Sequence, residues 1–393
     1  VWLVPGMLTL AVLSLPRLLS ISLAQDLSTA ARISYLEAGW QGLQARPALG
    51  WGAGAVPWTL GEFLRPTAGV HPASQIVGDL HSLPLQLAYE LGLGGLLLAV
   101  ATGIVFVYRR YREIGRETDD TARRAALLGL IGGALFGLGS SPLAVPALPF
   151  TAAMVAGVAL TGQSPAPSRH RIPLLLVYLL VAAGVLANID RGHRFYDRAR
   201  TATTPAASLE LITRARQTDP GFPLYLAREA WLSAELSGAD DTSAFRALTA
   251  ASGAPGLAPL WLAAGELGWR AGLPWAPVAL ARARDLDPLS PLVAFHLLTT
   301  TDQSVAAASL GEFAVTREPR LAGALWWSDH PALASQVSRQ TGVSIPLSVE
   351  EDSSPPMVLA LTLDREPSLS FSLFAFRRSP WPARLAPIAV HIP

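Results

Sequence analysis

The stretch HSLPLQLAYELGLGGLLLAVATGIVFVYRRYR, residues 81–112, decides the fold. It opens with a histidine, continues through a long and mostly apolar run, and ends in a cluster of arginines. A helix needs about 20 apolar residues to cross the hydrocarbon core of a membrane. The stretch therefore predicts a membrane helix over residues 85–108, with His81 just outside one end of it.

The composition agrees with a chain that lies partly in a membrane. Of its 393 residues 51% are hydrophobic and 15% are charged, whereas soluble domains carry roughly 25% charged residues. The net charge of +1 with scattered arginines provides no broad basic face, which argues against nucleic-acid binding. The chain contains no cysteine, so disulfides, thiolate metal sites and a cysteine nucleophile are excluded.

Four further apolar runs predict membrane helices, at residues 1–16, 125–141, 145–162 and 172–189. The runs at 125–141 and 145–162 are short and are separated by the turn SSPLAVP, so they predict a tight hairpin that crosses the membrane twice. The alternative is a pair of buried helices in a soluble core. The first run has no charged segment before it and no cleavage site after it, so we expect the chain to start inside a membrane segment.

The arginines predict the orientation of these helices. They cluster at residues 109–124 and at 169–171, and loops rich in arginine usually face the cytoplasm. The segment 22–84 and everything after residue 190 are then external. One feature opposes this topology, because RGHRFYDRAR at 191–200 places four arginines directly after the last helix.

The second half of the chain predicts a helical repeat. RARQTDPGFPL from Arg214 resembles RARDLDPLSPL from Arg282, and their separation is close to twice the tetratricopeptide period of about 34 residues. We expect two or three degenerate tetratricopeptide-like helix pairs between about 203 and 300. The alternative is a helical domain without repeats that reuses a common helix ending.

The predicted fold is therefore all-α. Residues 1–190 form a partial, polytopic transmembrane helical domain, and residues 191–345 form a soluble tetratricopeptide-like domain. Residues 346–393 form a short irregular or β-containing tail, since LALTL and SLSFSLFAF alternate as short strands do.

The external loop 22–84 carries the residues that point to chemistry. Arg32, Tyr35 and Trp40 come first, RPALGWGAG follows at 46–54, and HSLPLQLAYELGLGG at 81–95 enters the membrane helix. This order resembles the O-antigen ligase and polymerase superfamily, over roughly residues 17–162. These are polytopic bacterial membrane glycosyltransferases, and some carry an external tetratricopeptide-like domain.

The resemblance implies a reaction and its site. A glycan would move from an undecaprenyl-diphosphate carrier to a lipid, polysaccharide or protein acceptor at the outer face of the bacterial cytoplasmic membrane, without a metal or other cofactor. His81 would be catalytic, and Arg32 and Arg46 would bind the donor diphosphate. The chain departs from many relatives in having Ser82 where they have asparagine.

Elementary chemistry supports the same residue types. A diphosphate is a good leaving group that needs charge neutralisation, and guanidinium groups provide this with bidentate geometry. The acceptor hydroxyl is a poor nucleophile that gains from a base with a pKa near the operating pH, which suits a histidine. The sequence leaves open whether His81 is this base or a hydrogen-bond donor to the diphosphate.

Each candidate also has a simpler explanation. His81 could be a solvated residue, and Arg32 a headgroup anchor. Gly50, Gly52 and Gly54 suggest turn geometry more than a phosphate loop. Glu90 could hold an arginine or line a cavity, because a carboxylate in a membrane helix is costly unless it is paired.

Two possible metal motifs are dismissed. The sequence DLD at 285–287 lies at a repeat's helix end, and His71, Asp79 and His81 lack ligand spacing.

The prediction is thus the C-terminal portion of a multi-pass membrane glycosyltransferase with Tyr35, Trp40, the three glycines and Glu90 in supporting roles. The rival is a non-enzymatic membrane scaffold, whose repeats gather protein partners for envelope assembly.

Overall fold

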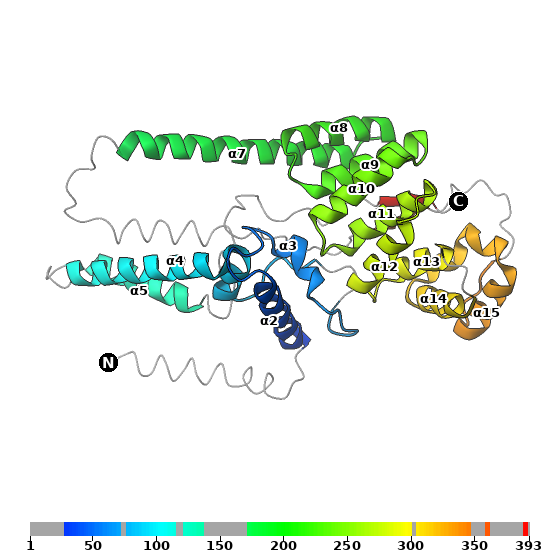
Figure 1. The fold of residues 1–393 in the computed structure, drawn as a ribbon, viewed down its shortest axis with the longest axis horizontal. Coiled ribbons are helices and arrows are strands. Elements are labelled where there is room, and N and C mark those ends of the chain that lie inside the picture. Colours follow the sequence, from blue (N-terminus) through cyan, green and yellow to red (C-terminus); the bar gives the residue numbers. More distant parts are fainter. Residues whose placement is uncertain are drawn as a thin grey trace.

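The computed structural model describes residues 27–71, 76–114, 121–136, 171–300, 304–346, 358–361 and 388–391. The regular structure of these residues is helical apart from one short two-stranded sheet (Figure 1). The helices of the first half are α2 Leu27–Ala45, α3 Val56–Thr59, η1 Leu60–Glu62, α4 Leu83–Ile114, α5 Thr121–Phe136 and α7 Arg171–Arg200. Those of the second half are α8 Pro205–Thr218, α9 Pro223–Ser237, α10 Asp241–Gly253, α11 Ala258–Arg270, α12 Ala276–Leu286, α13 Pro291–Thr300, α14 Ser304–Arg317, η3 Pro319–Gly323, η4 Leu325–Asp329 and α15 Pro331–Thr341. The strands β1 Val358–Leu361 and β2 Ile388–His391 pair antiparallel in the tail.

Helix α4 has two parts that differ in their surroundings. Before its kink at Gly92, the side chains of Tyr89 and Glu90 are completely buried. After the kink, Leu97 and Ile104 are 67% and 63% exposed. The kink therefore marks the boundary between the part of α4 that packs on the loop and the exposed apolar part of the helix.

The kink has a specific cause, which is that a loop segment replaces the helix's own hydrogen bonds. The backbone N–H groups of Trp51 and Gly52 donate to the carbonyls of Tyr89 and Glu90, at 2.9 and 2.8 Å. The N–H of Leu93 in turn donates to the carbonyl of Pro47 at 2.8 Å. Gly92 adopts φ 71° and ψ 178°, a conformation essentially restricted to glycine.

Helix α2 packs closely on α4 and on Leu80 just before it because two glycines of α2 leave room. A Cβ on Gly42 would lie 2.2 Å from Cε2 of Tyr89, and one on Gly39 would lie 2.8 Å from Cδ1 of Leu80. Tyr35 and Leu60 complete the small apolar core between α2, the loop and α4. The loop is therefore an ordered body attached to the start of α4.

One described helix segment, Leu83–Arg109, is long and apolar enough to cross a membrane. The predicted helix over 85–108 lies within α4, that over 125–141 overlaps α5, and that over 172–189 lies within α7. The predictions at 1–16 and 145–162 lie outside the described residues. In Figure 1, α4 and α7 both extend away from the loop and repeats toward the same end of the molecule.

The four arginines after the predicted last span lie on α7, which continues without interruption into the repeats. Arg194 pairs with Asp190 at 2.6 Å, and Arg200 pairs with Asp197 at 3.8 Å. Tyr196 on this part of α7 is buried in the core of the repeats. The segment that opposed the predicted topology is thus a structural helix with internal ion pairs.

The repeats form a chain of antiparallel helices in which each packs on the next, while α9 also contacts α11, and α11 contacts α13. The starts of α9, α11 and α13 follow one another at roughly the tetratricopeptide period of about 34 residues. Prolines in the first turn begin several of these helices, where their missing N–H costs no helical hydrogen bond. At the start of α10, Asp240 and Ser243 form a capping box.

Gly92→Ala should destabilise the protein by about 2–3 kcal/mol, because a Cβ adds steric strain at this backbone conformation. The added Cβ would also lie 2.1 Å from the carbonyl oxygen of Ala48. The matched control is Gly94→Ala, whose Cβ would lie 3.6 Å from the same oxygen, an ordinary contact. Thermal unfolding in detergent should show a lower midpoint for Gly92→Ala alone, and equal midpoints for the two variants would contradict this account of the kink.

Candidate functional site

His81, in the loop just before α4, has an unusual backbone conformation for a residue other than glycine. It is the one non-glycine residue with positive φ, 53°, in the described part of the chain, and such conformations concentrate at functional sites. Its backbone N–H donates to Oδ1 of Asp79 at 2.8 Å, and its ring Nδ1 lies 2.9 Å from the same oxygen. The His81 side chain is 37% exposed, so a reactant can reach it.

Tyr35 on α2 lies between the two loop histidines. Its ring centroid is 5.9 Å from that of His81 and 5.7 Å from that of His71. His71 is buried, and its Nδ1 accepts the backbone N–H of Thr67 at 3.0 Å. Its Nε2 lies 2.7 Å from the Ser34 hydroxyl. Burial lowers the pKa of His71 below its ordinary value, which keeps this ring neutral and in a structural role.

The RPALGWGAG segment wraps against the broken part of α4. Gly50, Gly52 and Gly54 all have positive φ, as the turn interpretation predicts. At Gly50 there is a second requirement, because a Cβ would lie 2.6 Å from the carbonyl oxygen of Glu90. Glu90 itself is fully buried, and its Oε1 accepts a hydrogen bond from Nε2 of Gln86 at 3.1 Å.

The structure does not bring Arg32 and Arg46 together. A rise of 1.5 Å per residue separates them by about 20 Å along the axis of α2. Arg32 is exposed and lies three residues from Tyr35, on the part of α2 that contacts His81. The Arg46 guanidinium stacks 4.1 Å from the centroid of Trp51, whose ring stacks in turn on Tyr89 near the kink. Of the two arginines, Arg32 is thus the one on the part of α2 that contacts His81, through Tyr35.

Trp40 points away from this site. It is 55% exposed and, with Ile33 and Leu36, forms an apolar face of α2 on the side away from the buried Ala38 and Gly42. Trp40 thus lies on the opposite side of α2 from the residues that pack on the loop, and its supporting role stays a prediction.

The residues that sequence reasoning missed are the polar partners of the loop. Asp79 was considered only as a metal ligand, and Ser34 was not considered. The buried Thr59 hydroxyl donates to the carbonyl of Ala55 at 2.8 Å and lies 2.7 Å from the Tyr89 hydroxyl. The one available signal was that Asp79 lies two residues before His81, the spacing of an Asx turn.

The loop also packs on the repeat helices, a contact that no sequence pattern predicts. The N–H of Gly256 donates to the carbonyl of Trp58 at 2.8 Å, and Trp58 meets Phe222 edge to face at 5.3 Å. Arg282 pairs with Glu62 at 2.8 Å. In the matching repeat position, Arg214 instead pairs with Glu210 on its own helix. The loop therefore joins α4 on one side and the repeats on the other.

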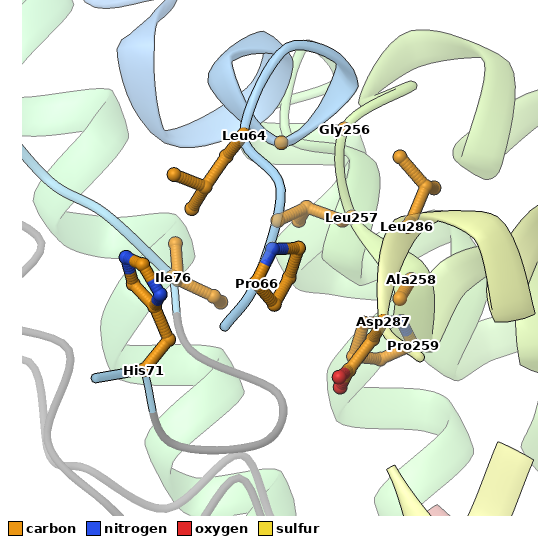
Figure 2. Close-up of a pocket in the computed structure, with 11 residues that line it drawn as sticks. Leu64, Pro66, His71, Ile76, Gly256, Leu257, Ala258, Pro259, Leu286 and Asp287 are labelled. Atoms are coloured by element: carbon orange, nitrogen blue, oxygen red, sulfur yellow. The ribbon is translucent and has the colours of Figure 1, made fainter. Parts of the chain in front are cut away.

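A small pocket lies at this junction (Figure 2). Leu64, His71 and Ile76 line it from the loop, and Leu257, Pro259 and Asp287 line it from the repeats. Asp287, the last residue of the DLD sequence, is buried, and its Oδ1 accepts the N–H of Leu289 at 3.2 Å, which is a turn role. Among the described residues, no three His, Cys, Asp or Glu side chains are grouped to hold a metal ion.

No protein-family model, curated protein or solved structure matches the chain. The class that the fold defines is therefore a structural one, namely a helical protein in which an ordered loop connects a long apolar helix to a helical repeat.

Gly61→Ala should separate the loop from the repeats, because its Cβ would lie 2.0 Å from the carbonyl oxygen of Gly256. The overlap is with backbone atoms of Gly256, so a change of side-chain rotamer cannot remove it. We expect the amide of Gly256 to lose at least about tenfold in hydrogen-exchange protection, since its bond to Trp58 is lost.

Gly253→Ala is the control for this variant. It lies three residues from Gly256, and its Cβ would lie 3.6 Å from Cγ of Pro223, an ordinary contact. Unchanged protection of Gly256 in Gly61→Ala would show that the loop is not held in this way.

Proposed function

We propose that the protein is a membrane glycosyltransferase of the O-antigen ligase or polymerase type. It would transfer a glycan from an undecaprenyl-diphosphate carrier to an acceptor at the external face of the bacterial cytoplasmic membrane, with the chain crossing the membrane several times and the repeats on the external side. The observation that carries the proposal is the placement of His81. It is a partly exposed histidine with a left-handed backbone, held by Asp79, at the start of a helix that becomes apolar and exposed after its kink.

The position of His81 suits a lipid-linked substrate. A lipid diphosphate has its acyl chain in the hydrocarbon core and its phosphates at the surface, and the exposed apolar part of α4 begins after Gly92. His81 lies two residues before α4 begins, on the other side of the kink from this apolar part. A base at this place can take the proton of an acceptor hydroxyl as that oxygen attacks the anomeric carbon.

The two arginines have different roles in this proposal. Arg32, on the side of α2 near His81, neutralises the diphosphate as it leaves. Arg46, which is stacked on Trp51 beside the kink, contacts the donor closer to the apolar part of α4. The sequence predicts that both arginines bind the donor diphosphate, and we propose that they contact the donor at two separate places along its length.

Removing the repeats does not separate this enzyme from a non-enzymatic scaffold. Ile76 and Trp58 of the loop pack against the core of the repeats, so deletion would expose them and disturb the loop as well. Point substitutions in the loop make the better test, because a scaffold that works through its repeats is insensitive to them.

His81→Asn should lower glycan transfer by at least about 100-fold, which is the scale of losing a general base. Asparagine tolerates positive φ better than alanine does, so the loop should keep its shape. The assay follows release of undecaprenyl diphosphate from a lipid-linked oligosaccharide, with the protein in nanodiscs and with lipid A core, polysaccharide or peptide offered as acceptor.

His330→Asn is the matched control, since His330 is an exposed histidine at the start of α15 and asparagine is a favoured residue there. It should retain full transfer. Full transfer by His81→Asn, in a chain whose wild type is active, would overturn the assignment of His81. A wild-type protein that gathers envelope proteins but never releases undecaprenyl diphosphate would favour the scaffold.

A further inference from the structure

Asp79 and His81 form a compact hydrogen-bonded unit. One carboxylate oxygen, Oδ1 of Asp79, accepts from the backbone N–H of His81 and faces its ring Nδ1, at 2.8 and 2.9 Å. The first of these contacts is an Asx turn, in which an aspartate bonds the backbone two residues further on. His81 has positive φ, and in this conformation its backbone N–H and its ring Nδ1 both lie close to Oδ1 of Asp79.

This geometry determines which ring nitrogen of His81 is basic. An ionised carboxylate only accepts hydrogen bonds, so Nδ1 carries the hydrogen in the neutral ring. The lone pair is then on Nε2, and the ring is 37% exposed while the Asp79 side chain is 15% exposed. Asp79 is thus the more buried partner, and the ring it holds is open to a reactant.

His71 provides an internal comparison. Its Nδ1 accepts the backbone N–H of Thr67, so its Nε2 carries the hydrogen and faces Ser34. The two loop histidines have opposite tautomers, and both nitrogens of His71 are engaged with the protein. The titratable groups that face His81 in the described structure are Asp79 from the loop and Tyr35 from α2.

We propose that Asp79 is a positioning residue, which holds His81 in the tautomer with a basic Nε2 and stabilises the imidazolium that forms when His81 takes a proton. This inference rests on the proposed function, because it assumes that His81 accepts the proton of the acceptor hydroxyl.

The step balances as follows. The acceptor hydroxyl gives its proton to Nε2 of His81, and its oxygen forms the new bond to the anomeric carbon. The bond from that carbon to the diphosphate oxygen breaks, and the electron pair leaves with the diphosphate. Asp79 stays ionised throughout, as the carboxylate does in the Ser-His-Asp arrangement, and His81 later returns its proton to solvent.

The test compares Asp79→Asn and Asp79→Ala in the nanodisc assay. Asparagine keeps an oxygen for the Asx turn and removes the charge, so we expect transfer to fall roughly 100-fold with donor KM within about threefold. Alanine removes the acceptor oxygen as well and should reduce transfer further.

Glu37→Gln is the control, since Glu37 is an exposed carboxylate on α2; it should leave both kcat and the donor KM unchanged. Wild-type kcat in Asp79→Asn would overturn the role of Asp79 while leaving His81 as the base. Full transfer by His81→Asn would instead overturn the proposed function, so the two failures are distinguishable.

A measurement without turnover covers the case in which the Asp79 variants fail to fold. Long-range ¹H–¹⁵N spectra of the wild-type protein labelled at histidine report the tautomer of each ring, and His81→Asn identifies the signal. We expect the hydrogen of His81 on Nδ1 and that of His71 on Nε2. A His81 ring with its hydrogen on Nε2 would contradict the proposal.

Discussion

The close approach of the loop to the broken helix α4 is the contact on which the rest of the structure depends. Three backbone hydrogen bonds join residues 47–52 to residues 89–93, and they replace bonds that an unbroken helix would make within itself. Buried backbone groups must find partners, so the kink and the loop require each other. Gly50 and Gly92 allow this contact because neither has a Cβ to prevent it.

This contact has consequences on both sides of the loop. Toward α4, it buries Tyr89 and Glu90 and leaves the apolar surface of the helix to begin after Gly92. Toward the repeats, the same loop continues into Trp58 and Glu62, which meet Phe222 and Arg282. The segment that carries His81 is therefore held between two helical bodies, and this suits a site that needs fixed geometry.

The sequence predicted the elements better than the contacts between them. The apolar run located α4 to within a few residues at its start, and the two RAR sequences lie near the ends of α8 and α12. The sequence does not predict the kink, because LGLGG looks like part of one continuous apolar helix. The helix bends at Gly92 because a loop that is distant in sequence packs against it. Arg214 and Arg282 look equivalent in sequence, yet only Arg282 reaches the loop.

For the site, the residue types were predictable but the pairings were not. Sequence order placed Arg32, Arg46 and His81 in one loop, whereas the length of α2 separates the two arginines by about 20 Å. The spacing of Asp79 and His81 is that of an Asx turn, but the left-handed backbone that brings the His81 ring onto the same oxygen cannot be predicted from this spacing alone.

The measurement that tests the central claim most directly is cross-linking with an undecaprenyl-diphosphate sugar that carries a photoreactive group on the sugar, followed by peptide mapping. The account predicts labels on α2 near Arg32 and on the loop around His81. Labels confined to the repeat helices would contradict it.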